Sequence, residues 1–238
     1  MGEQLRWWRV VPQARCTLIC LPHAGGNATA FRDWPAHLDE DVALAAACYP
    51  GRLGRYREPA ARTIAELAGP LAEAVGHVPG PVVLLGHSMG AVVAHEITAR
   101  LEAAGRPPRL LVVSGREAPH LVERASGPAD DADLLAQCRA LGGIPDEALE
   151  DAELRELVLA PLRADTALLD AYATASAPSI GTPILAYLGV DDPGCTPAQI
   201  DGWSALTTGP FRRRLLAGDH FSVLARPGEL LRDLCAQL

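Results

Sequence analysis

The sequence predicts an α/β fold in which a mostly parallel sheet is covered by helices on both faces. Short apolar runs alternate with segments of helical spacing along the 238 residues, which is the pattern of parallel strands joined by helices. A chain of this length and of 49% hydrophobic composition can bury a substantial core. We therefore expect a single domain over residues 1–238, interrupted by one helical lid insertion at about 119–176.

Six apolar runs predict the strands of the sheet. Parallel strands are buried on both faces, so they show nearly continuous apolar sequence rather than strict alternation. The predicted strands are Cys16–Leu21, Val42–Cys48, Val82–Leu85, Leu110–Ser114, Ile184–Gly189 and Phe211–Leu216. Between them, residues 64–75 and 91–104 carry apolar side chains at helical spacing, which predicts two helices that cover the sheet.

The insertion at 119–176 shows no strand signal. Its sequence is acidic and helical, with separate helical patterns at 130–141, 146–159 and 163–172. A long insertion after a core strand is a common place for a lid that controls access to an active site. We expect these helices to cover the functional residues.

The motif Gly86-His87-Ser88-Met89-Gly90 follows the apolar run 82–85 directly and precedes a helical segment. In such a strand-turn-helix, a strained serine projects its Oγ above the carboxyl edge of the sheet. The flanking glycines are needed because a Cβ at either position would collide across the turn. The motif predicts a nucleophilic serine, Ser88, in an α/β-hydrolase fold.

A serine hydroxyl needs a base beside it to act as a nucleophile at neutral pH. In this fold the partners follow in the order serine, acid, histidine, so the base should lie late in the chain. His220 follows the last predicted strand, whereas His95 falls within a predicted helix and His120 at the start of the insertion. We therefore predict His220 as the general base.

The acid should follow an earlier strand, where its carboxylate would fix the tautomer of the histidine. Asp191 and Asp192 both follow the predicted strand 184–189, and spacing alone does not choose between them. Glu117, just past the preceding strand, is a third candidate.

Two backbone N–H groups should face the negative oxygen that develops during the reaction. One belongs to the residue after the nucleophile, Met89. The other should come from the loop after the first predicted strand, where the paired Gly25 and Gly26 let the backbone turn closely. We choose the N–H of Ala24 as the second donor, with that of Gly25 as its nearest rival.

Composition excludes several function classes. A net charge of −8 disfavours nucleic acid and anionic membranes as partners. The chain has neither a membrane-spanning apolar run nor a signal peptide, so we expect a cytoplasmic protein. The six cysteines show no metal-binding spacing, and we expect them to be buried thiols. No cofactor or metal is expected.

Motifs along nearly the whole chain resemble those of type II thioesterases, the free-standing editing hydrolases of polyketide synthases and nonribosomal peptide synthetases. They are Pro22–Gly26, Tyr49–Arg52, Gly86–Ala91, Ser114–Arg116 with Ala118–Pro119, Leu141–Pro145, Leu162–Asp165 and Gly218–Phe221. The resemblance implies that Asp192, directly before a proline, is the acid, and that Ala24 and Met89 form the oxyanion hole. It also implies removal of acyl groups from the phosphopantetheine arm of acyl or peptidyl carrier proteins through an acyl-serine.

Two positions depart from the family pattern. Asp219 stands where a glycine commonly precedes the histidine, and Thr166 stands where an aromatic residue often follows the Leu-Arg-Ala-Asp motif.

The alternative functions are a product-releasing thioesterase, a general esterase, and a non-catalytic accessory that binds carrier proteins. Because little sequence precedes the first predicted strand, we expect a free-standing, monomeric editing enzyme.

Overall fold

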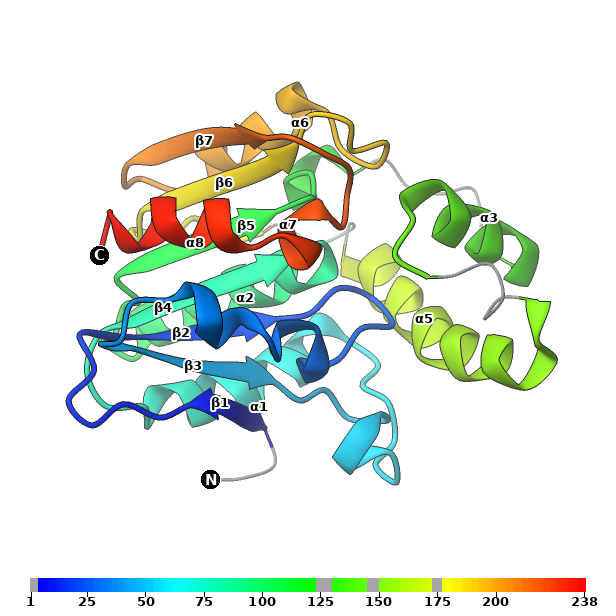
Figure 1. Ribbon diagram of the computed structural model, residues 1–238, viewed down its shortest axis with the longest axis horizontal. Helices are drawn as coiled ribbons and strands as arrows, with labels where there is room; N and C mark the ends of the chain where they lie inside the picture. Colours follow the sequence, from blue (N-terminus) through cyan, green and yellow to red (C-terminus); the bar gives the residue numbers. More distant parts are fainter. Residues whose placement is uncertain (1–3, 123–129, 145–149, 173–176) are drawn as a thin grey trace.

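The structure is a computed structural model that describes residues 4–122, 130–144, 150–172 and 177–238. A seven-stranded sheet forms its centre, in the order β1-β3-β2-β4-β5-β6-β7 (Figure 1). Only the edge pair β1 and β3 is antiparallel, and all the other neighbours pair in parallel. The strands are β1 (Leu5–Arg9), β2 (Cys16–Leu21), β3 (Val42–Ala47), β4 (Val82–His87), β5 (Leu110–Ser114), β6 (Ile184–Gly189) and β7 (Phe211–Leu216).

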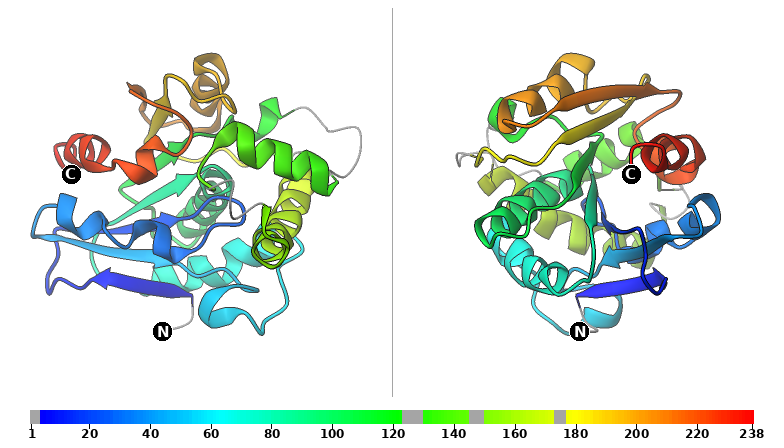
Figure 2. Two further views of the ribbon diagram at one scale, coloured as in Figure 1. Left: turned by 45° about the vertical axis from the view of Figure 1, so that its right-hand side comes forward. Right: turned by 90° about the vertical axis from the view of Figure 1, so that its left-hand side faces the viewer.

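Helices cover both faces of the sheet, which confirms the predicted architecture (Figure 2). The helices described are α1 (Ile64–Gly76), α2 (Met89–Ala103), α3 (Asp131–Leu141), α5 (Ala152–Tyr172), α6 (Pro197–Asp201), α7 (Ser222–Ala225) and α8 (Gly228–Cys235). One core cluster joins α1 and α2 to Ile19 and Leu84, and the other joins α8 to Leu18 and Leu85. Successive residues of β2 and β4 thus point to opposite faces and are buried on both.

All six predicted strands are present, and several elements lie outside the prediction, among them β1 and α8. β1 is a short edge strand of sequence Leu-Arg-Trp-Trp-Arg whose side chains are mostly part-exposed, so it carries no continuous apolar run. Its partner β3 supplies the pairing that the local sequence does not indicate. α8 has only eight residues, fewer than the roughly 11 over which helical spacing is recognised, although Leu230, Leu231 and Leu234 are fully buried.

The insertion between β5 and β6 contributes α3 and α5, which we call the insertion helices (Figure 1). α3 matches the predicted helix at 130–141 and begins with a capping box formed by Asp130 and Asp133. The predicted break between 159 and 163 is wrong, because α5 is one helix that contains Pro161. Burial of Leu159 and Leu162 on either side of the proline offsets the lost backbone hydrogen bond. The start of the predicted helix at 146 lies outside the described residues.

The expectation of buried thiols is confirmed for five of the six cysteines. Each is free, and all are buried except Cys48, which is half-buried. Burial raises the pKa of the Cys16 thiol to about 11 and that of the Cys195 thiol to about 12, so the reactive thiolate is disfavoured. Within the ranges the structure covers, no helix combines the length and apolar content needed to cross a lipid bilayer.

Candidate active site

Ser88 lies in the sharp turn between β4 and α2, with φ 53° and ψ −120°. Its N–H donates to the carbonyl oxygen of Ser114 at 2.8 Å, which ties the turn to the end of β5. A Cβ on Gly86 would come within 2.1 Å of the Gly90 carbonyl oxygen. A left-handed serine is strained, and the two glycines make room for the tight turn that holds it.

Gly90→Ala is expected to lower the free energy of unfolding by about 3 kcal/mol or more, since overpacking against rigid backbone is costly. The added Cβ would lie 2.1 Å from the carbonyl oxygen of Leu21, so β2 and α2 would have to separate. Thermal denaturation followed by circular dichroism measures the change. Gly54→Ala is the matched control, because its Cβ would meet nothing within 4 Å. Equal stability of the two variants would contradict this expectation.

His220 and Asp192 form a buried pair at the carboxyl ends of β7 and β6. The His220 Nδ1 lies 2.8 Å from the Asp192 Oδ2, and both side chains are at most 3% exposed. The other carboxylate oxygen, Oδ1, accepts the N–H of Gly194 at 2.8 Å. A carboxylate beside Nδ1 keeps the proton there and leaves Nε2 as the acceptor. That Nε2 is buried and has no hydrogen-bond partner in the described part of the chain.

The end of β5 brings this pair to the serine. A Cβ on Gly115 would lie 3.1 Å from the His220 Cε1 and 2.9 Å from the His87 ring, so the backbone touches both imidazoles. Gly115 follows Ser114, the residue that accepts the Ser88 N–H. Ser88 and His220 also line the same cavity. Side chains from three distant segments therefore meet at one edge of the sheet.

The other candidate acids lie elsewhere. Asp191 is exposed, and its backbone N–H donates to the Gly218 carbonyl oxygen at 3.0 Å. Glu117 accepts a hydrogen bond from the Gln199 Nε2 at 2.9 Å. Of the three carboxylates considered from the sequence, only that of Asp192 contacts the His220 ring in the described structure.

The other histidines and Asp219 have separate environments. His95 is buried within α2, with its ring 5.5 Å from that of Trp203, and burial lowers its pKa to about 4. His120 is exposed. Asp219 does not bind the His220 ring in the structure: its carboxylate accepts the hydroxyl of Ser222 at 2.7 Å, at the start of α7.

The two N–H groups chosen for the oxyanion hole are available. No hydrogen bond among the described residues engages the N–H of Ala24 or of Met89. The rival Gly25 N–H donates instead to the Asp165 carboxylate at 2.8 Å. Ala24 and Gly25 line the cavity together with Ser88. The geometry favours Ala24 over Gly25 as the donor that can reach a ligand.

Two further histidines, His23 and His87, lie near His220, and no sequence signal beyond their place in motifs singles them out. The His87 ring lies 4.8 Å from the His220 ring, and the His23 ring packs at 4.9 Å against Phe221. Burial, together with the charges of His220 and Arg52, lowers the pKa of His23 to about 4. Burial also lowers the pKa of His87 well below its usual value. Both rings are therefore neutral at pH 7 and add no positive charge beside His220.

The cavity has a volume of about 630 Å³ and is bounded on one side by the insertion helices. Its apolar wall includes Cys138, Leu141, Ile144, Leu157, Val158, Leu162 and Leu169. Thr166, the position where the family often has an aromatic residue, also lines it. No cluster of three or more metal-binding side chains occurs in the described ranges. The arrangement suits a nucleophilic serine that receives a largely apolar acyl group.

The chain is similar in sequence and in fold to known thioesterases. A family model described as the thioesterase domain matches residues 16–238. The thioesterase PikA5 of Streptomyces venezuelae is 34% identical over 100% of this chain and 86% of its own. The type II thioesterase BorB of the borrelidin biosynthetic cluster is 35% identical, with a TM-score of 0.87 over 99% of this chain and 98% of its own. YbtT, a type II thioesterase of the yersiniabactin NRPS/PKS pathway, is 33% identical, with a TM-score of 0.89 over 98% and 97%.

Proposed function

The chain belongs to the thioesterase family, and we propose that it hydrolyses acyl thioesters on carrier proteins. It has an α/β-hydrolase fold, and the solved structures that resemble it include type II thioesterases. The acyl group would arrive on the phosphopantetheine arm of an acyl or peptidyl carrier protein. The observation that carries the proposal is the shared cavity, which Ser88 lines together with His220, the ring that is paired with Asp192. A solved serine-to-alanine mutant of YbtT also supports a nucleophilic serine.

In the first half of the reaction, His220 Nε2 takes the proton of the Ser88 hydroxyl while Oγ attacks the thioester carbonyl. The N–H groups of Ala24 and Met89 donate to the resulting oxyanion. The Asp192 carboxylate stabilises the imidazolium that forms. When the C–S bond breaks, His220 returns the proton to the pantetheine sulfur, and an acyl-serine remains.

The second half repeats this chemistry with water. His220 takes a proton from a water molecule that attacks the acyl-serine, and the same two N–H groups bind the oxyanion. The proton then goes to the Ser88 Oγ, and the free carboxylic acid leaves. Every step uses groups of this chain, so the proposal calls for no cofactor or metal.

The insertion helices act as the lid of this site. Leu157 is 71% exposed and yet lines the cavity, so it stands at the rim through which an acyl chain would pass. Leu154 lies beside it on α5, 49% exposed, and lines the same cavity. We propose an editing role, because the similar proteins of comparable length are type II thioesterases.

The test compares acetyl, propionyl, hexanoyl and aminoacyl groups, each loaded on a carrier protein and on N-acetylcysteamine. We expect kcat/KM to be about tenfold or more higher on the carrier, equivalent to about 1.4 kcal/mol of added binding in the transition state. A full-length product chain on the same carrier is the further substrate: preference for the short groups supports editing, and the reverse identifies product release.

Two outcomes would contradict the proposal. Hydrolysis of simple esters without hydrolysis of any carrier-bound acyl group would identify a general esterase. Failure of a fluorophosphonate probe to label Ser88 in the folded protein would favour a non-catalytic accessory.

A further inference from the structure

The carboxylate of Asp165, on the insertion helix α5, contacts the loop that follows β2. Its Oδ2 accepts the N–H of Gly25 at 2.8 Å, across 140 residues of sequence. The same oxygen accepts Nη1 of Arg52 at 2.8 Å, and Oδ1 accepts Nη2 at 2.6 Å. The Asp165 side chain is 2% exposed and that of Arg52 is 9% exposed. This is a buried, bidentate ion pair with a backbone amide as its third member.

The segment Pro22–Asn27, which we call the 22–27 loop, is bound by hydrogen bonds from other segments at Pro22, Gly25 and Gly26. Arg52 Nη1 also donates to the carbonyl oxygen of Gly26 at 2.8 Å. The hydroxyl of Tyr49 donates to the carbonyl oxygen of Pro22 at 3.2 Å, and the Arg52 guanidinium lies 5.3 Å from the Tyr49 ring centre. The contacts at Pro22 and Gly26 come from the segment after β3. Of these three hydrogen-bonded places only Gly25 is bound by the insertion, whose apolar cluster also packs against Ala24.

Ala24 lies between these anchors. Its neighbour Gly25 has φ +72°. Glycine has no Cβ and reaches many other backbone conformations as easily, so the residue itself does little to fix the loop. The Asp165 contact fixes the peptide plane that joins Ala24 to Gly25, and it occupies the N–H that would otherwise compete with that of Ala24. The N–H of Ala24 belongs to the preceding peptide plane, which shares the Ala24 Cα with this one, so displacement of the 24–25 peptide would also shift the Ala24 N–H.

We propose that Asp165 and Arg52 are positioning residues that hold the N–H of Ala24 toward the carbonyl oxygen of the acyl group on Ser88. Docking of α5 thereby completes the oxyanion hole, and the lid is part of the catalytic apparatus as well as a cover. This inference rests on the acyl-serine mechanism proposed above. Because an oxyanion hole acts on the transition state, the effect belongs to kcat.

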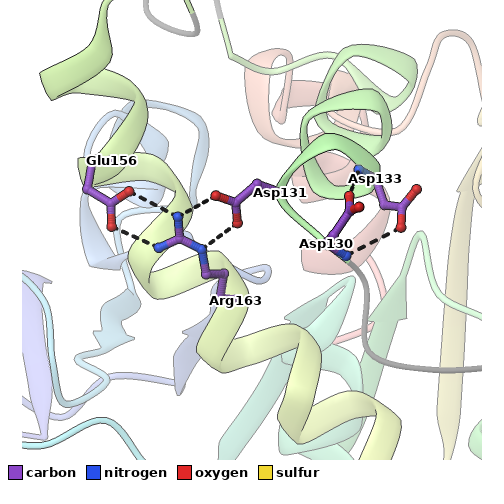
Figure 3. Close-up of polar contacts among 5 residues, drawn as sticks. All are labelled: Asp130, Asp131, Asp133, Glu156 and Arg163. Atoms are coloured by element: carbon purple, nitrogen blue, oxygen red, sulfur yellow. Dashed lines mark hydrogen bonds and ion pairs between the residues drawn. The ribbon is translucent and has the colours of Figure 1, made fainter.

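A second ion pair on the same helix provides a matched control. Arg163, two residues before Asp165, binds Asp131 of α3 at 2.6 Å and Glu156 at 2.8 Å (Figure 3). Its side chain is 37% exposed and those of its two partners are more exposed still. These ion pairs join α3 to α5 and, among the described residues, include no hydrogen bond to the 22–27 loop. Arg163→Lys therefore weakens the contact between the insertion helices without removing a hydrogen bond to that loop.

The experiment measures kcat and KM for butyryl-N-acetylcysteamine in Asp165→Asn, Arg52→Lys, the double variant and Arg163→Lys. We expect kcat to fall by about 10- to 100-fold in both single variants, with KM changed by less than about threefold, because displaced donors lose transition-state binding. The kcat of the double variant should lie within about threefold of the kcat of the less active single variant, because the two side chains act as one unit. Arg163→Lys should stay within about twofold of the parent.

Deuterium exchange of the peptide that spans the 22–27 loop gives a readout independent of turnover. Asp165→Asn should raise its exchange, and Arg163→Lys should not. If Asp165→Asn fails to fold, Arg52→Lys carries both measurements. If the parent hydrolyses no thioester, the proposed function fails and the exchange measurement alone decides whether Asp165 holds the loop.

Three results would overturn the positioning proposal. The first is a folded Asp165→Asn protein with the kcat of the parent. The second is an equal loss of kcat in Arg163→Lys, which would indicate general anchoring of the insertion. The third is unchanged deuterium exchange in the 22–27 loop of Asp165→Asn.

Discussion

Replacing Ser88 by alanine is expected to reduce kcat for thioester hydrolysis by about 10⁴- to 10⁶-fold, the range seen when a triad nucleophile is removed. The Oγ forms the bond to the acyl group, and no other hydroxyl takes its place in the described site. His220 and the N–H groups of Ala24 and Met89 would remain, so a small residual rate over water should persist. Release of the free thiol, followed with a chromogenic disulfide, measures the change.

Ser204→Ala is the control for this prediction. Ser204 is an exposed serine in the 3-10 helix at 202–206, which follows β6 in the chain. It is not among the residues that line the cavity. Its replacement should leave kcat and KM unchanged. If Ser88→Ala kept a tenth of the parent activity, the acyl-serine mechanism would be wrong.

Asp192→Asn is expected to lower kcat by about 10³- to 10⁴-fold, comparable to the loss measured for a triad acid changed to its amide. The Gly194 N–H donates to Oδ1, so the amide must place its oxygen there. Its NH₂ group then faces the His220 Nδ1, which becomes an acceptor. The ring proton moves to Nε2, and the imidazole can no longer accept the hydroxyl proton.

The neighbouring Asp191→Asn tests whether position or charge decides the effect. Its carboxylate is exposed, and the contact of Asp191 with Gly218 is made by the backbone. We expect the activity of this variant to stay within about twofold of the parent, as for other exposed substitutions. Equal losses at 191 and 192 would indicate a general electrostatic effect and contradict the assignment. Steady-state kinetics at pH 7 distinguish the two cases.

The fold was predictable wherever an element is buried enough to require an apolar pattern in its own sequence. β2 and β4 are buried on both faces, so their apolar runs mark them without ambiguity. β1 is an edge strand defined by its partner, and its own five residues carry no such mark. The continuous α5 was missed for a related reason: Pro161 favours a break locally, whereas packing of Leu159 and Leu162 keeps the helix intact.

The candidate site divides in the same way. Ser88 could be read from a five-residue motif, because the turn that exposes it is made by adjacent residues. Spacing could not separate Asp191 from Asp192, since the choice depends on which carboxylate turns toward a ring 28 residues away. The contact of Asp165 with Gly25 spans 140 residues and involves a backbone amide, so no local sequence pattern predicts it.

The turn after α3 limits how this enzyme can be redesigned. Gly143 has φ +85°, and a Cβ there would lie 2.6 Å from the ring of Phe221, next to His220. Any side chain at this position would push on the Phe221 ring, which packs 5.0 Å from the His220 ring. Thr166 lines the cavity from α5, whose helical backbone accepts larger or smaller residues. Protein engineers who wish to alter the accepted acyl length should therefore vary α5 at Thr166 and leave the paired glycines untouched.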